Sequence, residues 1–395
     1  MTNPIQPNST SSNSGPAQPS PAQPSLAQPV QASTADAQGV PKDALMMQRC
    51  CELAAKAAGQ TAPNPLVGSV ITQNGDIVGE GYHPKAGEPH AEVFALRDAG
   101  AKAEGGTLYV NLEPCNHQGR TPPCSEAVIR AGLRRVVIGM EDPNPKAAGG
   151  IEKLRAAGIE VTVGVEGDRC RHLNEAFIHR VTHQRPFGIL KYAMTLDGKI
   201  ASTTGHSAWI SGPQSRQQVH QLRSRCDAVI VGGNTVRKDN PNLTSHGQSD
   251  HNPLRVVMSR QLDLPTKANL WDTREIQTLV VTQSDADASV KAALERQGVE
   301  VLSLPLLTPD AAMAALHERG CMVVLWECGG TLAAKAIAAG AVQKVWAFIA
   351  PKIIGGAIAP SPIGDLGLTE MTKAKALSQV TLTTVGEDIL LKGYL

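Results

Sequence analysis

Two short segments decide how this chain folds and which chemistry it carries: His90-Ala91-Glu92, and Pro114-Cys115-Asn116-His117-Gln118-Gly119-Arg120-Thr121-Pro122-Pro123-Cys124. One histidine and two cysteines are ligands that zinc prefers, and three of them leave its fourth position for water. Zinc lowers the pKa of that water to about 7, and a nearby glutamate carries the proton to a leaving amine. The pattern predicts a hydrolytic zinc deaminase site with His90, Cys115 and Cys124 as ligands and Glu92 as the proton shuttle.

The flanking residues predict that both halves of this site lie at helix starts. Pro89 precedes the apolar run 93–96, and Pro122-Pro123 precede the apolar run 127–129. Proline favours the first positions of a helix. Residues two apart on a helix point about 200° apart, so the histidine and the glutamate converge only at an open first turn. A thiol at a helix start is readily held as a thiolate.

The spacing of the two cysteines departs from the usual zinc deaminase signature. That signature places two residues between the cysteines, whereas eight lie between Cys115 and Cys124. We expect the polar residues 116–121 to contact a substrate larger than a bare base. His117 is an alternative ligand, but three ligands are already supplied. A structural zinc module is the other interpretation, although it would need a fourth ligand and no carboxylate beside it.

Length and composition bound the class of protein. The 395 residues are enough for two domains and a tail. Lys plus Arg number 37 against 36 Asp plus Glu, and aromatic residues make up 3%, which argues against a nucleic acid partner. The 8 cysteines form no disulfide framework in a chain of this size, so we expect a reducing, cytoplasmic location. No apolar run reaches the length of a bilayer span, so no membrane partner is expected.

Residues 1–40 differ from the rest of the chain. They are rich in Pro, Ser, Gln, Ala and Asn and repeat Ala-Gln-Pro. They have neither the basic start nor the apolar centre of a secretory signal. With few large apolar residues to bury, they are expected to be a disordered tail.

Residues 41–184 alternate between helical and strand patterns. Strands are expected at 107–112, 135–140 and 159–163, a hairpin at 67–82 around Asn74-Gly75, and helices at 43–58, after His90, after Cys124, before 159 and up to about 182. This alternation predicts a three-layer α/β/α domain with a mixed sheet. Open α/β sheets place ligands at strand ends.

Gln184-Arg185-Pro186 is the expected boundary to a second α/β domain at residues 185–395. Its expected strands are 187–193, 228–231, 254–258, 278–282, 299–302, 322–326 and 344–349, its helices 214–224, 288–297, 310–319 and 331–339, and its edge hairpin 379–391. Gly329-Gly330 and Gly232-Gly233 each follow a strand and are candidate phosphate sites, with a tight turn as the other interpretation. Residues 195–199 are expected to form a turn between strands.

Further motifs run in order from about residue 44 to the C-terminus. They are Ala62-Pro63-Asn64-Pro65-Leu66-Val67-Gly68, Gly87-Glu88-Pro89 before His90, Asp142-Pro143-Asn144-Pro145, Leu196-Asp197-Gly198-Lys199, Trp209-Ile210-Ser211, Asp239-Asn240-Pro241-Asn242-Leu243-Thr244 and Ala350-Pro351-Lys352-Ile353-Ile354-Gly355-Gly356. With the two zinc segments, they resemble the bifunctional deaminase/reductase family of riboflavin biosynthesis. The resemblance implies a cytidine-deaminase-like α/β/α domain followed by a dihydrofolate-reductase-like α/β domain.

The resemblance implies two consecutive reactions on a small-molecule substrate. The first domain would use one Zn²⁺ to remove an amine from 2,5-diamino-6-(5-phosphoribosylamino)pyrimidin-4-one. The second would use NADPH to reduce the ribosyl group of the product to ribityl, with the hydride supplied by the cofactor. The sequence leaves open whether the chain forms a homo-oligomer.

The resemblance also implies binding residues in the second domain. Those matched to the cofactor are Ala193, Trp209, Thr235, Asp239 and the loop Gly329, Gly330, Thr331, Leu332, Ala333, Ala334 and Lys335. Those matched to the substrate are Ser207, Arg223, Leu243, His246 and Glu327. Arg223 is expected to pair with the substrate phosphate. The alternatives are packing for Ala193 and Leu243, a core position for Trp209, and a solvated helix charge for Arg223.

Three departures from the family pattern bear on the second activity. His246 stands where the family usually has arginine, Ser259-Arg260 replaces aspartate followed by serine or threonine, and Cys328 replaces glycine or alanine. A deaminase with a degenerate reductase domain is therefore one alternative function. A nucleic-acid-editing zinc deaminase is the other.

Overall fold

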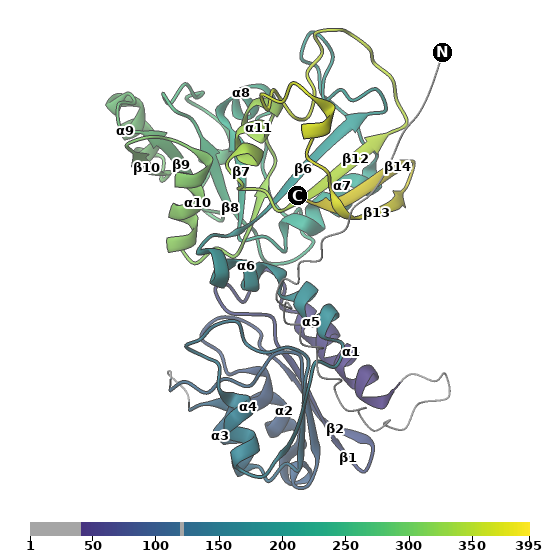
Figure 1. Ribbon diagram of the computed structural model, residues 1–395. Coiled ribbons are helices and arrows are strands. Elements are labelled where there is room, and N and C mark those ends of the chain that lie inside the picture. Colours follow the sequence, from purple (N-terminus) through teal and green to yellow (C-terminus); the bar gives the residue numbers. More distant parts are fainter. Residues whose placement is uncertain (1–40, 119–121) are drawn as a thin grey trace, which may run out of the picture.

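The computed structural model describes residues 41–118 and 122–395. The expected tail at residues 1–40 and part of the cysteine loop, residues 119–121, lie outside the described residues. The rest folds into two α/β bodies, each built around its own sheet, with α5 (Gly167–Leu173) and α6 (Glu175–His183) at the junction (Figure 1).

The first body has a five-stranded mixed sheet in the order β2-β1-β3-β4-β5. In chain order, its helices and strands are α1 (Lys42–Ala55), β1 (Gly68–Gln73), β2 (Asp76–Tyr82), α2 (Ala91–Ala99), a 3-10 turn (Gly100–Ala103), β3 (Thr107–Val110), α3 (Cys124–Arg130), β4 (Arg135–Ile138), α4 (Gly150–Ala156) and β5 (Glu160–Val163). β1 is antiparallel to β2 and β3, whereas β3, β4 and β5 are parallel. Helices α2, α3 and α4 cover one face, and α1 and α5 the other (Figure 1). The expected α/β/α domain with a mixed sheet is confirmed.

The hairpin β1–β2 shows how local sequence sets this fold. Asn74 has φ 51° and Gly75 has φ 98°. Two consecutive positive φ angles are what a type I′ turn requires, and Asn-Gly is the dipeptide that adopts them with least strain. The hairpin expected from Asn74-Gly75 is therefore confirmed.

The second body has a nine-stranded sheet in the order β10-β9-β8-β7-β11-β6-β12-β14-β13. Its elements are β6 (Phe187–Thr195), α7 (Pro213–Arg223), β7 (Ala228–Gly232), α8 (Gly233–Asp239), β8 (Leu254–Met258), a 3-10 turn (Asn269–Trp271), β9 (Thr278–Gln283), α9 (Ala288–Arg296), β10 (Glu300–Leu304), α10 (Pro309–Glu318), β11 (Val323–Trp326), α11 (Gly330–Ala338), β12 (Lys344–Ala350), a 3-10 turn (Met371–Lys373), β13 (Ser378–Val385) and β14 (Asp388–Tyr394). All neighbours are parallel except the final β12–β14–β13 pairs. The expected edge hairpin is confirmed.

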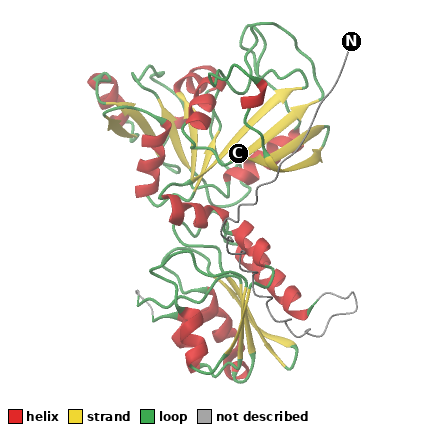
Figure 2. Ribbon diagram, viewed as in Figure 1, coloured by secondary structure: helices red, strands yellow, loops and turns green. Residues whose placement is uncertain are grey.

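Alternation along the central strands places a core on each face of this sheet. In β7, Ala228 and Ile230 pack in one core with residues of α10 and α11, whereas Val229 and Val231 pack in the other with residues of α7, α8 and α9. Successive residues of a strand point to opposite faces, so a strand covered on both sides is apolar at every position. Figure 2 shows these helices on either side of the strands.

Two local expectations were wrong, and a third was correct only in part. The helix expected to run to about residue 182 is divided into α5 and α6 at Asn174, whose side chain bonds the backbone N–H and carbonyl of Leu66 instead of continuing the helix. Helix α8 was not expected, because Gly232-Gly233 was interpreted as a phosphate loop or a turn. Residues 195–199 do turn after β6, but an irregular segment follows and the next strand begins at Ala228.

Helix α6 connects the two bodies through side chains as well as through the chain. Arg180 donates to the carbonyl oxygens of Cys321 (2.8 Å) and His317 (2.9 Å). Glu175 at the start of α6 pairs with Lys344 of β12 at 2.8 Å. The linker helix is therefore bonded to the second body along its length.

Within residues 41–118 and 122–395, no helix combines the length and the apolar character needed to cross a bilayer.

Candidate active sites

The two zinc segments meet at helix starts. His90 is the N-terminal cap of α2, and Cys124 is the first residue of α3. Cys115 lies in the loop after β3, and the Cβ of any residue other than glycine at Gly150 would approach the carbonyl of Pro114 to 1.9 Å. The start of α4 thus abuts the loop that carries Cys115.

The ligand atoms of this cluster are spaced as a zinc ion requires. Nδ1 of His90 lies 3.2 Å from Sγ of Cys124 and 3.4 Å from Sγ of Cys115. A tetrahedral zinc ion at its usual bond lengths holds nitrogen and sulfur ligands roughly 3.5 Å apart. Among the described residues, these are the only group of three or more His, Cys, Asp or Glu ligand atoms brought together in this way. His117 is not part of the group, so the residues present fit one three-ligand zinc site.

Glu92 lies beside the cluster and has a free oxygen. The residue is 3% exposed, and its Oε2 has no hydrogen-bond partner among the described residues. Burying a carboxylate oxygen without a hydrogen-bond partner costs free energy. In native proteins such a group is typical of a site that binds a ligand or a reactant. The position of Glu92 fits a reacting water and amine next to the metal.

The electrostatics of the cluster favour a bound cation. A hydrogen bond from the Cys124 side chain lowers the pKa of Cys115 to about 4, and the resulting thiolate raises the pKa of Cys124. Without a cation, only one of the two thiols is readily deprotonated. A coordinated metal allows both to be thiolates, because thiols that bind a metal are deprotonated. Burial raises the pKa of Glu92 to about 7, with the negative Cys115 acting in the same direction. A carboxyl with a pKa near neutrality can both accept and donate a proton.

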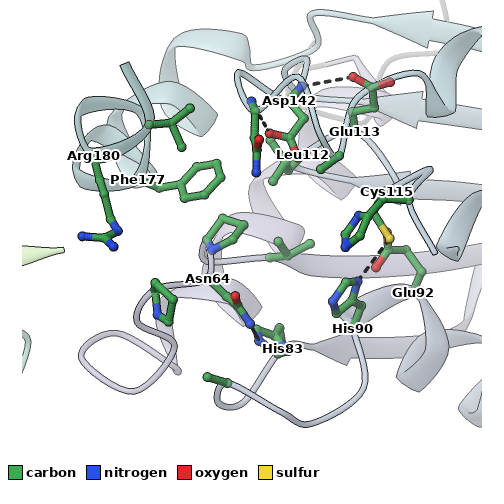
Figure 3. Close-up of a pocket in the computed structure, with 18 of the residues that line it drawn as sticks. Asn64, His83, His90, Glu92, Leu112, Glu113, Cys115, Asp142, Phe177 and Arg180 are labelled. Atoms are coloured by element: carbon green, nitrogen blue, oxygen red, sulfur yellow. Dashed lines mark hydrogen bonds between the residues drawn. The ribbon is translucent and has the colours of Figure 1, made fainter. Parts of the chain in front are cut away.

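The cluster opens into a cavity of about 670 Å³. Figure 3 shows His90, Glu92 and Cys115 at one end and Phe177 and Arg180 of α6 at the other. A cavity of this volume takes a ligand of drug size. The zinc cluster therefore lies at one end of a space that extends as far as the linker helix.

A loop anchor supports the wall of this cavity. The buried carboxylate of Glu113 accepts from the backbone N–H groups of Asp142 (3.1 Å), Gly149 (2.9 Å) and Ile151 (3.0 Å). Charge-assisted bonds of this type are the stronger class of hydrogen bond. Glu113 thus fixes the segment that carries Asp142 into the cavity.

The second body holds two adjoining cavities of about 540 and 920 Å³ that share several lining residues. The structure brings most of the expected binding residues to their walls: Ala193, Ser207, Trp209, Arg223, Thr235, Asp239, Leu243, Glu327, Gly329, Gly330, Thr331 and Leu332. Both glycine pairs considered as phosphate loops contribute to this surface, through Gly232 and through Gly329-Gly330. The space lies at the carboxyl ends of β6, β7 and β11, where α/β sheets bind ligands.

An ion group lies at the base of these cavities. Arg223 forks onto the carboxylate of Glu327 with bonds of 2.6 and 3.0 Å, and Nζ of Lys191 lies 3.7 Å from the same carboxylate. Burial acts to raise the pKa of Glu327, but Arg223 and Lys191 outweigh it and lower the pKa to about 2. For Lys191 burial has the opposite effect and lowers the pKa, while the carboxylate of Glu327 acts to raise it. Two cations against one carboxylate leave the group positive.

Two family models match the chain. The cytidine and deoxycytidylate deaminase zinc-binding region matches residues 41–140, and the RibD C-terminal domain matches residues 186–391. The riboflavin biosynthesis protein RibD of Synechocystis sp. is 60% identical over 354 residues, which cover 89% of this chain and 96% of that protein. The chain belongs to the RibD family. The RibD of Aquifex aeolicus is 44% identical over 347 residues, covering 87% and 96% of the two chains.

RibD proteins of known structure share the fold through both domains. The diaminohydroxyphosphoribosylaminopyrimidine deaminase/5-amino-6-(5-phosphoribosylamino)uracil reductase of Thermotoga maritima is 36% identical, with a TM-score of 0.81 over 89% of this chain and 98% of that chain. Form 1 of Acinetobacter baumannii RibD is 35% identical, with a TM-score of 0.81 over the same shares. The expected succession of a deaminase-like and a reductase domain is confirmed.

Some expected binding residues of this RibD family member lie away from the cavity walls. Ala333 and Ala334 lie on the buried face of α11, and Lys335 is exposed on the same helix. Their assignment to the cofactor stays a prediction. Trp209 is 70% exposed, so the alternative of a core aromatic was wrong. Leu243 both packs in the core and lines the cavity.

Arg223 and His246 have partners that the sequence did not indicate. Arg223 is bound by Glu327 and is not a solvated helix charge. The ring of His246 stacks on His220 of α7, with centroids 4.0 Å apart. Burial lowers the pKa of His220 to about 4, and His246 and Arg223 act in the same direction. The substrate contacts assigned to Arg223 and His246 stay predictions.

Sequence reasoning missed three polar residues that line the cavities. Nδ2 of Asn64 lies 3.1 Å from Nε2 of His83 in the wall of the first cavity. Asn64 lies in a quoted motif but received no role, and His83 lies in an ordinary loop pattern. Lys191 was visible as a single charge inside the apolar strand β6, an unusual position for lysine.

Proposed function

We propose that this chain catalyses two consecutive steps of riboflavin biosynthesis. The first is hydrolytic deamination of 2,5-diamino-6-(5-phosphoribosylamino)pyrimidin-4-one, and the second is reduction of the ribosyl group to ribityl with NADPH. The observation that carries the proposal is the buried carboxylate of Glu92 beside the three clustered ligands, because its Oε2 has no hydrogen-bond partner among the described residues. The names of the related proteins supply the substrate class.

In the deaminase, His90, Cys115 and Cys124 would hold zinc. When bound, zinc supplies the Lewis acidity that makes water a nucleophile near neutral pH. Glu92 takes a proton from water and delivers it to the departing amine, so that a ring C–N bond breaks, a ring C–O bond forms and ammonia leaves. Asn64, His83 and Asp142 offer hydrogen-bonding groups to the pyrimidine from the cavity wall.

In the reductase, the cavities over β6, β7 and β11 would hold NADPH and the deaminated product. When bound, the cofactor would supply a hydride to C1 of the ribosyl group, while the bond from C1 to the ring oxygen breaks and that oxygen takes a proton. The proposed cofactor contacts are Ala193, Trp209, Thr235, Asp239 and residues 329–335. The positive group of Lys191, Arg223 and Glu327 lies where an anionic phosphorylated substrate would bind, with Ser207, Leu243 and His246 as further contacts.

We place the deaminase domain at residues 41–184 and the reductase domain at residues 185–395. The expected boundary falls between the end of α6 and the start of β6. All eight cysteines are free thiols in the structure, which supports a reducing, cytoplasmic location. The near balance of 37 basic and 36 acidic residues favours a small-molecule substrate over a nucleic acid.

The variant Glu92→Gln tests the proposed chemistry. Ammonia release should fall roughly a thousandfold, because the proton shuttle is lost while the ligands stay. Metal analysis should still find one zinc per chain, and NADPH oxidation with supplied deaminated intermediate should be unchanged. Glu104→Gln, an exposed position outside the cavity, is the control. Full deamination by Glu92→Gln would refute the assigned role, and no NADPH oxidation by the wild type would favour the deaminase-only alternative.

A further inference from the structure

Two loops lie side by side at the carboxyl ends of neighbouring strands in the second body. Residues 196–212 follow β6, and residues 351–370 follow β12, which pairs parallel with β6 (Figure 1). The carboxylate of Asp197 in the first loop accepts from the backbone N–H of Gly355 in the second at 2.7 Å. The first loop supplies part of the wall of the cavity of about 920 Å³. The second loop therefore supports a wall of that cavity.

Trp209 in the first loop has an unusual backbone and an unusual exposure. Its φ angle is 61°, in the left-handed region that a bulky residue rarely adopts. The residue is 70% exposed at the cavity wall, whereas Trp271 and Trp326 are at most 4% exposed. A strained backbone persists only where the surrounding contacts hold it, and such strain is concentrated at sites that bind ligands. The contacts that hold Trp209 are therefore relevant to binding.

Two cations bind three consecutive carbonyl oxygens of this segment. Nζ of Lys352 donates to the carbonyl of Trp209 at 2.7 Å and to that of Ile210 at 2.9 Å. Nη1 of Arg216 donates to the carbonyl of Ser211 at 2.8 Å. Hydrogen bonds from a charged donor are stronger than those between neutral groups. Together these bonds fix the backbone through residues 209–211, and so they determine where the indole ring lies.

The guanidinium of Arg216 also lies over the ring of Trp209, 4.3 Å from the ring centroid. A cation at this distance is attracted to the face of an indole. An aromatic ring has two faces, and Arg216 occupies one of them, so the exposed area of Trp209 includes the other. Aromatic rings prefer offset stacking on a partner of this kind. The free face of the indole is thus suited to a planar ring of a ligand.

We propose that Lys352 is a positioning residue of the reductase and acts through Trp209. Its ammonium group keeps residues 209–211 in the conformation that presents the free face of the indole to a planar ring of the cofactor. Lys352 is not among the residues that line the two cavities of the second body, so its effect is transmitted through the loop. This inference rests on the proposed reduction with NADPH.

Lys352→Met should raise KM for NADPH about tenfold and leave kcat nearly unchanged, because about 1.4 kcal/mol of binding free energy is then used to order the loop. The rate is measured as NADPH oxidation with supplied deaminated intermediate. Lys352→Arg keeps a charged donor for the carbonyls and should restore most of the loss. Lys373→Met removes an exposed lysine that pairs with Glu370 after the same strand, and it should leave KM unchanged.

The outcomes separate this inference from the proposed function. An active Lys352→Met enzyme with the wild-type KM for NADPH would overturn the positioning role alone. A wild type that oxidises no NADPH would overturn the proposed reduction, and the inference with it. Unfolding of Lys352→Met, recorded by circular dichroism, together with a wild-type KM in Lys352→Arg would show a merely structural contact.

A double-mutant cycle with Trp209→Ala tests whether Lys352 acts through the ring. In the Trp209→Ala background, Lys352→Met should raise KM by less than about twofold, because the group that it positions is absent. Effects that multiply would give Lys352 its own contact with the cofactor and would contradict the proposal.

Tryptophan fluorescence gives a further readout, since Trp209 is the exposed one of the four tryptophans. Saturating NADPH should reduce acrylamide quenching of the wild type, because the cofactor covers the free face of the ring. The reduction should be smaller in Lys352→Met, where the ring is no longer held in place. Equal quenching of the wild type with and without NADPH would show that no ligand ring covers Trp209, and this result would also overturn the proposal.

Discussion

Two buried glutamates have opposite roles in this molecule. One oxygen of Glu92 has no partner among the described residues, whereas Arg223 bonds both oxygens of Glu327 and Lys191 lies 3.7 Å away. The first carboxylate is available to reactants. The second neutralises part of a buried positive group, so its removal affects stability as well as binding.

Glu327→Gln should destabilise the second domain by about 3 kcal/mol, because it leaves buried cations without a countercharge. All 4 tryptophans lie beyond residue 184, so urea unfolding followed by tryptophan fluorescence reports this domain. NADPH oxidation should be lost and deamination retained. The control Glu300→Gln breaks an exposed pair on the same sheet and should cost less than about 1 kcal/mol. Equal losses in the two variants would contradict the prediction.

His179 should make stability depend on pH. Burial, then His183 and Arg185, lower the pKa of His179 to about 4, against about 6.5 in an unfolded chain. Between these values the unfolded state binds more protons, so the contribution of the neutral ring is complete above pH 6.5 and is lost as the pH falls toward 4. The wild type should lose more unfolding free energy between pH 7.5 and pH 5 than His179→Gln does. Parallel losses would show that His179 does not titrate as expected.

Single residues could be predicted where a short motif implies the chemistry. His90, Glu92, Cys115 and Cys124 were identified from their types and order, since zinc hydrolysis needs those groups. His83 and Lys191 could not, because each reaches its cavity only through the arrangement of loops and strands that are distant in the sequence. The amino-acid sequence alone does not indicate such contacts.

At the scale of elements, helix α6 contacts both cavity and partner domain. Phe177 and Arg180 line the deaminase cavity (Figure 3), and Arg180 also bonds carbonyls of the reductase body. The guanidinium of Arg180 therefore links the wall of the deaminase cavity to the surface of the reductase body.

Arg180→Met should uncouple the two domains while keeping the apolar stem of the side chain. The carbonyls of His317 and Cys321 lose their donor, so hydrogen exchange in α6 should become faster. Calorimetry should show the unfolding transitions of the two domains moving apart. Arg296→Met, on the exposed end of α9, removes a guanidinium that bonds a carbonyl of its own helix and should change neither measurement. Unchanged exchange in α6 of Arg180→Met would rule out the coupling.

Elements with strong periodicity were predicted well, and their interruptions were not. The alternating strands and the Asn74-Gly75 hairpin were correct because local sequence determines them. The break at Asn174 depends on a bond to Leu66, which is distant in the sequence. Helix α8 begins at a glycine pair that by propensity alone disfavours a helix.

At the scale of the whole molecule, zinc removal should destabilise one domain selectively. A metal that binds only the folded state stabilises it, so a chelator should lower the thermal transition of the deaminase domain by several degrees. Circular dichroism records both domains, whereas tryptophan fluorescence reports the reductase domain alone. The fluorescence transition should move less than the circular dichroism transition. Equal shifts would place the metal's influence in the second domain as well.

The order of the two domains was predictable from the sequence because each has its own motifs and its own alternation of strands and helices. Their mutual arrangement was not, since Glu175 with Lys344 and Arg180 with Cys321 are contacts between surfaces that show no pattern along the chain.

The dual attachment of α6 bears on how such a polypeptide could be divided during evolution. Division of the chain after residue 184 would leave Arg180 without its carbonyl acceptors. It would also expose the side of α6 that contacts the second body. A free-standing descendant would need compensating substitutions on that surface before it became autonomous. The contacts of α6 with the second body therefore favour keeping the two domains on one chain.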